Sequence, residues 1–145
     1  NKVPSFNLYD KENIHKSSYL DILDDDLKPY FKAAVGNYRV TEDAKKEFSK
    51  LKLDINKISN LMNTHHNYLK NELKITTPEI DKMIDVSKKN GAIGSKIVGS
   101  GGGGSIVSLS TNSNTSNKIV SELKRIGVKD VFIAKKGKGP TINYE

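Results

Sequence analysis

A run of glycines in the second half of the chain is the feature most able to take part in chemistry. The run is Gly99-Ser100-Gly101-Gly102-Gly103-Gly104, and Ser105 follows it. Residues without a Cβ let another body approach the backbone closely, and exposed N–H groups in such a loop can bind an anion. Neither Ser100 nor Ser105 has a neighbouring His pattern for nucleophilic catalysis. The run therefore predicts a loop that contacts phosphate through its backbone and supplies no catalytic residue.

Two alternative interpretations of the run stay open at this point. Its glycines formally match G-x-G-x-x-G, but a dinucleotide-binding fingerprint needs a strand before it and a helix after it. The residues that follow, 105–110, are β-branched and typical of a strand, and no Lys follows Gly104 as in a Walker A loop. The run also looks like an engineered Gly-Ser linker. The apolar sequence on both sides, with the pattern of two strands joined directly, argues against that alternative.

Histidines and carboxylates elsewhere are weaker candidates. His65 and His66 are adjacent on an expected helix and point about 100° apart, so they do not easily share one metal. His65 falls on the apolar stripe of that helix, which favours a place in the core or at a domain interface. Asp81 and Asp85 share a helix face among lysines, and Asp24–Asp26 form an acidic run. Both carboxylate groups are expected on solvated surfaces, so the sequence predicts no metal site.

Charge and composition exclude several classes of protein. The chain has 145 residues, which fit one domain, and a formal net charge of +7 with a pI near 9.4. Only Arg39 and Arg125 are arginines, and the lysines are interleaved with acids. Because arginine supplies the bidentate contacts to bases and phosphates, this distribution disfavours a nucleic-acid partner. The local cluster at Lys135, Lys136 and Lys138 is expected to be a solvated face.

The sequence also lacks the marks of membrane and disulfide-bonded proteins. No apolar run approaches the ~18 residues of a membrane span, and the first residues do not resemble a signal peptide. There is no cysteine, which excludes disulfides and thiolate metal sites. We expect no membrane partner and a cytoplasmic location. Because the chain starts at Asn, it is expected to be a piece of something longer.

Helical spacing of apolar residues predicts several helices before the glycine run. Ser17 or Ser18 is expected to cap a short turn through Leu27. Residues 29–51 are expected to form one bent helix or two, divided near Gly36 or Thr41. Asp54 caps the next helix, whose apolar stripe reaches Leu69, and Thr77 caps a third that ends at Asn90-Gly91.

The second half alternates between strand and helix patterns. Short β-branched runs flank the glycine run, and a polar loop precedes a final amphipathic helix. The predicted elements are strands at 95–98 and 105–110, a loop at 113–116, a helix at 119–126, and further strands at 128–134 and 141–144. Helices followed by strand, strand, helix and strand predict an α+β fold with a small antiparallel sheet backed by helices.

The stretch from Gly91 to Gly104 resembles the third motif of the GHMP small-molecule kinases. This family groups galactokinases, homoserine kinases, mevalonate kinases and phosphomevalonate kinases. Residues 61–69 and 77–81 are similar to the galactokinase run LMxxSH…L…ScPELD. Residues 38–44 are similar to the HVxTENQR helix start, from which Asp43-Ala44 departs. Galactokinases usually carry a bulky residue at the place of Gly102, whereas mevalonate kinases often have four glycines there. The resemblance covers about residues 38–134.

The resemblance implies a ferredoxin-like C-terminal domain over residues 29–145, after an irregular lead-in at 1–28. The family's ATP-binding loop and catalytic Asp belong to an N-terminal domain that has no counterpart here. The full enzyme would use ATP and Mg²⁺ to phosphorylate galactose to galactose 1-phosphate, and the loop Gly99–Gly104 would close over the phosphate end of the cleft. This chain alone is expected to fold, to phosphorylate nothing and to hold no cofactor tightly.

The resemblance also sets the expected partners and alternatives. The substrate, a sugar, would bind together with the missing N-terminal domain. The face that meets that domain would be apolar, and it favours a homodimer of the fragment. The alternative within the family is a mevalonate kinase or another GHMP kinase. The alternative from another class is a non-catalytic domain that binds a small molecule for regulation.

Overall fold

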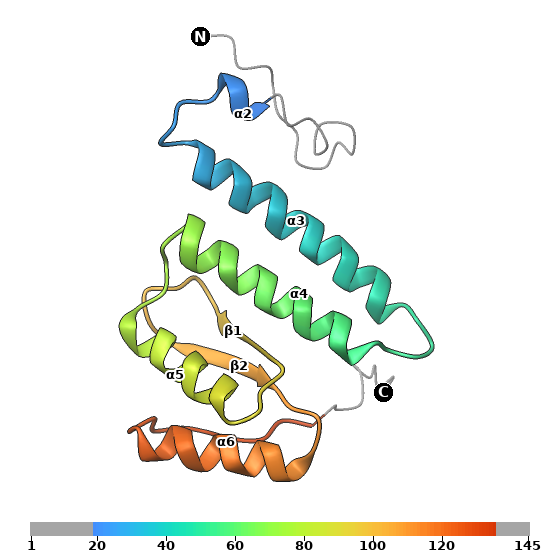
Figure 1. The fold of residues 1–145 in the computed structure, drawn as a ribbon, viewed down its shortest axis with the longest axis vertical. Coiled ribbons are helices and arrows are strands. Elements are labelled where there is room, and N and C mark those ends of the chain that lie inside the picture. The colour runs from blue at the N-terminus through green and yellow to red at the C-terminus, as the bar shows by residue number, and fades with distance from the viewer. Residues whose placement is uncertain (1–18, 136–145) are drawn as a thin grey trace, which may run out of the picture.

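The computed structural model describes residues 19–135, in which helices surround a small two-stranded sheet (Figure 1). This arrangement confirms the predicted α+β class, with a small antiparallel sheet packed against helices. No helix in the described range is long and apolar enough to cross a membrane. The elements in chain order are α2 (Tyr19–Ile22), α3 (Lys28–Phe48), α4 (Ile55–Asn67), the π-helix η1 (Tyr68–Glu72), α5 (Pro78–Lys89), β1 (Gly94–Val98), β2 (Ser105–Leu109) and α6 (Ser113–Arg125).

Of the two alternatives for this region, one helix and not two is found, because α3 continues without a break past Gly36 and Thr41. Gly36 is buried where the ring of Tyr68 lies directly against its Cα, and a Cβ there would overlap the ring. Thr41 caps nothing, because its hydroxyl donates to the carbonyl of Asn37 one turn back (2.8 Å). The glycine therefore serves close packing of α3 on η1 rather than a kink. Residues 1–18, which hold most of the expected lead-in, lie outside the described residues.

The predicted caps of the two central helices are confirmed. The Asp54 side chain accepts hydrogen bonds from the backbone N–H groups of Asn56 (3.0 Å) and Lys57 (3.1 Å) at the start of α4. The Thr77 hydroxyl accepts from the N–H of Ile80 (3.4 Å) at the start of α5, which ends before Gly91 at φ +101°. Each cap satisfies N–H groups that a helix cannot pair internally.

A buried glutamate holds the turn between α3 and α4. Glu47 is 0% exposed, and its carboxylate accepts from Lys50 (2.7 Å) and from the backbone N–H of Asp54 (3.0 Å). Lys57 lies 3.4 Å from the same carboxylate. Chiefly through the Lys50 hydrogen bond, these contacts lower the pKa of Glu47 from 4.5 to about 2. The antiparallel pairing of α3 and α4 in Figure 1 is fixed at this end by one ionised group.

The sheet is a hairpin that is held by the helices packed against it. Strands β1 and β2 are antiparallel, with Gly94 opposite Leu109 and Val98 opposite Ser105. Ile97 is fully buried against the helices in a cluster with Leu69, Ile80 and Ile84. A second cluster of Ala92, Ile119 and Leu123 joins α6 to the rest. A two-stranded hairpin is marginal by itself in water, so these helix contacts hold the sheet.

Helix α4 fastens the start of β1 through a single amide side chain. Asn63 donates to the carbonyl of Ile93 (3.0 Å) and accepts from the N–H of Ser95 (3.2 Å). Gly94 lies between these two groups, where a Cβ would come within 2.9 Å of the Ser59 backbone. Asparagine and glycine together therefore let the helix and the strand approach closely, with two backbone groups satisfied.

Two predictions for the second half are wrong. Residues 113–116 are not a loop but the first turn of α6, because Asn112 accepts from the N–H of Thr115 (2.9 Å) and caps the helix there. Residues 128–134 do not form a strand, although they are rich in β-branched side chains. Val128 and Val131, three residues apart, pack on the second cluster, while Phe132 is exposed. This spacing lacks the alternation of a strand. The strand predicted at 141–144 lies outside the described residues.

The first testable prediction concerns Asn63. Asn63→Ala should lower the free energy of unfolding by about 2 kcal/mol, because it leaves the Ile93 carbonyl and the Ser95 N–H unpaired at a partly buried position. Asn60→Ala, at an exposed position of the same helix, is the matched control and should change stability by less than about 0.5 kcal/mol. Urea unfolding measures both. Unchanged hydrogen-exchange protection of the Ser95 amide in Asn63→Ala would contradict this role.

A second prediction concerns pH. Because the pKa of Glu47 is lower in the folded chain, its contribution to stability is complete above about 4.5 and is lost as pH falls toward about 2. Glu47→Gln should lower the melting temperature at pH 7 and flatten its decline over that window. Asp43→Asn, which removes an exposed pair on the same helix, should leave the decline as in the parent chain. Thermal melts from pH 7 to 2 test this, and a parallel decline in Glu47→Gln would contradict it.

Candidate functional site

The glycine run forms the loop that joins β1 to β2. Gly99, Gly101, Gly102, Gly103 and Gly104 all have positive φ, between +74° and +136°. Side chains with a Cβ rarely adopt this backbone region, so the conformation of the loop itself requires glycine. The loop is followed by a strand and not by a helix, which excludes the dinucleotide-binding arrangement.

One side of the loop is fastened to the segment that leads into α5. The N–H of Gly102 donates to the carbonyl of Ile75 (2.9 Å), and a Cβ on Gly101 would lie 2.6 Å from that oxygen. A Cβ on Gly99, Gly103 or Gly104 would meet nothing within 4 Å. The loop therefore has a fixed half and an open half, and the open half offers backbone to an approaching group.

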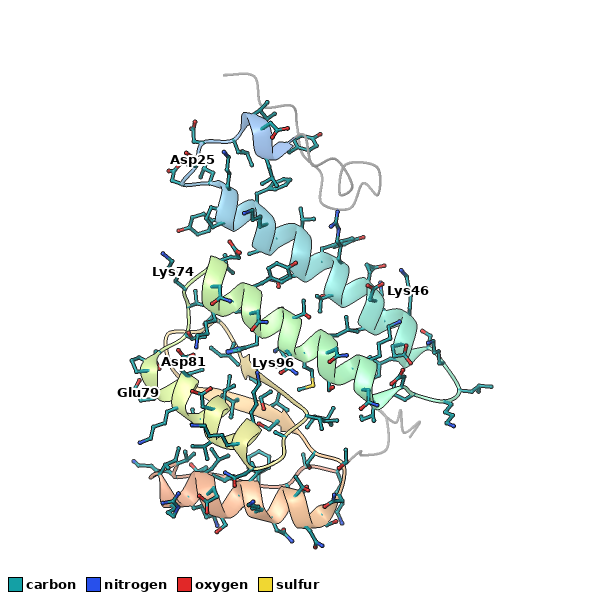
Figure 2. The ribbon with its side chains drawn as sticks, viewed as in Figure 1. Asp25, Lys46, Lys74, Glu79, Asp81 and Lys96 are labelled. Atoms are coloured by element: carbon teal, nitrogen blue, oxygen red, sulfur yellow. The ribbon has the colours of Figure 1, made fainter. Side chains whose placement is uncertain are left out.

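The residues around the loop carry both signs of charge. Lys74, Glu79 and Asp81 lie on the left side of the view in Figure 2. Lys70 lies 3.0 Å from Asp81 and offsets its charge. Glu79 in the first turn of α5 has a lowered pKa, because its own backbone N–H and the Thr77 hydroxyl hydrogen-bond to it. This carboxylate therefore already occupies the start of α5.

The carboxylate candidates do not assemble into a site. Asp81 is engaged with Lys70, and Asp85 is exposed. In the acidic run, Asp25 pairs with Lys28 at 2.6 Å on the surface. Within residues 19–135, no group of three or more His, Asp or Glu side chains lies close enough to hold a metal ion.

The two histidines occupy different surroundings. His66 is 3% exposed, and its Nδ1 has no hydrogen-bond partner among the described residues. His65 is half-buried and lines a groove. Burial is the main cause that lowers the pKa of both, and Lys96 adds to the effect. The sequence predicted a place in the core or at a domain interface for His65, whereas His66 is the more deeply buried of the two histidines.

Sequence reasoning missed the groove itself, which lies between α3, α4 and the hairpin. It has a volume of about 340 Å³, and apolar side chains form most of its walls. Val40 and Ala44 come from α3, Leu61 and Met62 from α4, and Val107 from β2. These residues are far apart in sequence, so only the pairing of α3 with α4 brings them together. The available signal was Lys96, the one charged residue of β1.

Comparison with known proteins gives one family and several relatives. The family model described as "GHMP kinases C terminal" matches residues 44–129. A galactokinase of Actinobacillus succinogenes is 34% identical over 87 residues, which are 54% of this chain and 22% of that protein. A mevalonate kinase of Methanocaldococcus jannaschii is 35% identical over 69 residues, 48% of this chain and 21% of that protein. A galactokinase of Dictyostelium discoideum is 34% identical over 59 residues, 41% of this chain and 12% of that protein.

Each of these matches covers only a small part of the relative's length. The chain spans about a fifth of the length of the first two relatives. The matched residues 44–129 include α4, α5, the hairpin with its glycine loop and α6. The similarity to galactokinases and to a mevalonate kinase is nearly equal in identity.

A third prediction tests how the loop is held. Gly101→Ala and Gly102→Ala both place a side chain at positive φ, which costs about 1 kcal/mol each. Only Gly101→Ala also drives a Cβ against the Ile75 carbonyl. We therefore expect Gly101→Ala to be less stable than Gly102→Ala by about 1–2 kcal/mol, with faster exchange of the residue 102 amide. Urea unfolding and hydrogen exchange measure this, and equal effects of the two variants would contradict the anchor.

Proposed function

The chain belongs to the C-terminal family of the GHMP kinases, and from that premise we propose that it is the C-terminal domain of a galactose kinase. The proposed enzyme transfers the γ-phosphoryl group of ATP to galactose and yields galactose 1-phosphate. The family consists of kinases, and two of the relatives described above are galactokinases. The observation that carries the role of this chain is the half-anchored glycine loop, with Gly103 and Gly104 open to solvent space.

The proposed contribution of this chain is backbone hydrogen bonding to a phosphoryl group. Phosphoryl transfer depends mainly on positioning and on stabilising charge on the phosphoryl oxygens. N–H donors on the open half of Gly99–Gly104 suit that task because they are preorganised by the anchor at Ile75. Mg²⁺, when bound, supplies charge neutralisation on the phosphates. Since the described residues bring no carboxylate cluster to the loop, the catalytic base and the metal ligands are assigned to the rest of the enzyme.

Mevalonate is the alternative substrate, and a specific observation favours it. The loop has glycine at Gly102, where galactokinases usually have a bulky residue, and the mevalonate kinase relative is 35% identical over its matched part. The alternative of another class is a non-catalytic domain that binds a small molecule.

The proposed partner of the chain is the N-terminal part of the kinase, which would complete the sugar and ATP sites. An apolar tip at the α3–α4 turn, made of Phe48, Leu51, Leu53 and Ile55, is exposed. Such a surface fits contact with another domain, and in the chain alone it favours self-association into a homodimer. The proposal includes no nucleic-acid or membrane partner and places the enzyme in the cytoplasm, with its supply of ATP.

The fourth prediction is a comparison of activities. We expect the longer polypeptide that contains this chain to phosphorylate galactose with ATP and Mg²⁺, and residues 1–145 alone to phosphorylate nothing. ADP release, measured with galactose and with mevalonate as separate substrates, checks both parts. Turnover of mevalonate without galactose would assign the alternative substrate, and turnover of neither would favour the binding module. Sugar phosphate formed by residues 1–145 alone would contradict the division of labour.

A further inference from the structure

The apolar groove between α3, α4 and the hairpin has the dimensions of a ligand site. Its volume is about 340 Å³, within the range of roughly 300–1,000 Å³ typical of small-molecule pockets. Such pockets are mainly apolar with a few placed polar groups. Here Val40 and Ala44 face Leu61 and Met62 across the groove, and the polar groups on its wall include Lys96 and His65.

Lys96 is the unusual member of this wall. Lys96 is a partly buried residue, and its ammonium group donates to the carbonyl of the next residue, Ile97 (2.7 Å). Among the described residues no carboxylate lies within 4.0 Å of it. Glu47, the buried carboxylate of α3, is already held by Lys50 and Lys57. An ammonium has three donors, so Lys96 keeps donors for a further acceptor.

The protonation state of His65 determines how much negative charge on a ligand the groove can balance. Burial and the nearby Lys96 lower the pKa of His65 from 6.5, so the imidazole is neutral at pH 7 and offers one N–H. Burial also lowers the pKa of Lys96, which stays protonated when an anion is beside it. The groove thus presents one positive charge above an apolar floor. One negative charge on an apolar body matches this arrangement better than a phosphate dianion does.

We propose that the groove binds a small apolar molecule with one carboxylate, of the medium-chain fatty acid class. The carboxylate lies against Lys96 Nζ, and the hydrocarbon lies between α3 and α4 beside Ala44 and Met62. Figure 2 shows Lys96 within the outline of the molecule, whereas Lys46 and Lys74 extend from its rim. The proposal is independent of the kinase reaction, because the groove residues are not part of the glycine loop.

The fifth prediction tests this site with decanoate, kept below its micelle concentration, on residues 1–145 without ATP. Amide NMR signals of groove residues should shift in a saturable way. 1-Decanol, the uncharged isostere, should bind at least tenfold more weakly. Lys96→Met keeps the aliphatic stem and should also weaken decanoate at least tenfold. Lys82→Met, at an exposed position of α5, is the control and should bind decanoate as the parent chain does.

A measurement on the unmodified chain keeps the test decisive even where Lys96→Met fails to fold. Decanoate should raise the pKa of Lys96, followed through its side-chain NMR signals, and decanol should not. Equal binding of decanol and decanoate, an unchanged Lys96 pKa, or shifts confined to Leu51, Leu53 and Ile55 of the apolar tip, which do not line the groove, would each overturn the proposal. None of these outcomes bears on galactose turnover, so failure here is distinguishable from failure of the proposed function.

Discussion

A hairpin of two strands is not stable by itself in water, and the contact between Asn63 and β1 attaches this hairpin to helix α4. The strand has one sheet neighbour among the described residues, so its other side needs partners for its backbone. Asn63 supplies two hydrogen bonds around Gly94 and ties the strand to α4. This attachment also positions the glycine loop, because the loop directly follows β1. The groove exists for the same reason, since α4 forms one of its walls.

Close approach without side chains is the second theme of the fold. Gly36 admits the ring of Tyr68 between α3 and η1, Gly94 admits α4, and Gly101 admits the Ile75 carbonyl. Each of these glycines lies where two elements meet, and each removes a Cβ that would separate them. The open glycines of the loop differ, because there the missing side chains leave space for a body outside the described residues. Glycine thus allows close packing between elements at some positions and leaves the backbone of the loop accessible at others.

The sequence allowed prediction wherever the deciding interaction is local. The caps at Asp54 and Thr77 act within two or three residues, and the flanking runs of the hairpin have a strand composition. The double contact of Asn63 spans 30 and 32 residues and leaves no local pattern. Residues 128–134 were mistaken for a strand because composition outweighed spacing. The groove escaped prediction since its walls come from four elements that only tertiary packing assembles.

The π-helix η1 makes the number of residues between α4 and α5 matter as much as their identity. The N–H of Leu73 donates to the carbonyl of Tyr68 (3.1 Å), a span of five residues that adds one residue to the turn. In this register Leu69 points into the core while Lys70 reaches Asp81. Deletion of one residue here would restore an ordinary helix and rotate everything beyond it by about 100°. We therefore expect a change of length to disturb this segment more than the open half of the glycine loop, where a Cβ on Gly103 or Gly104 would meet no other atom within 4 Å.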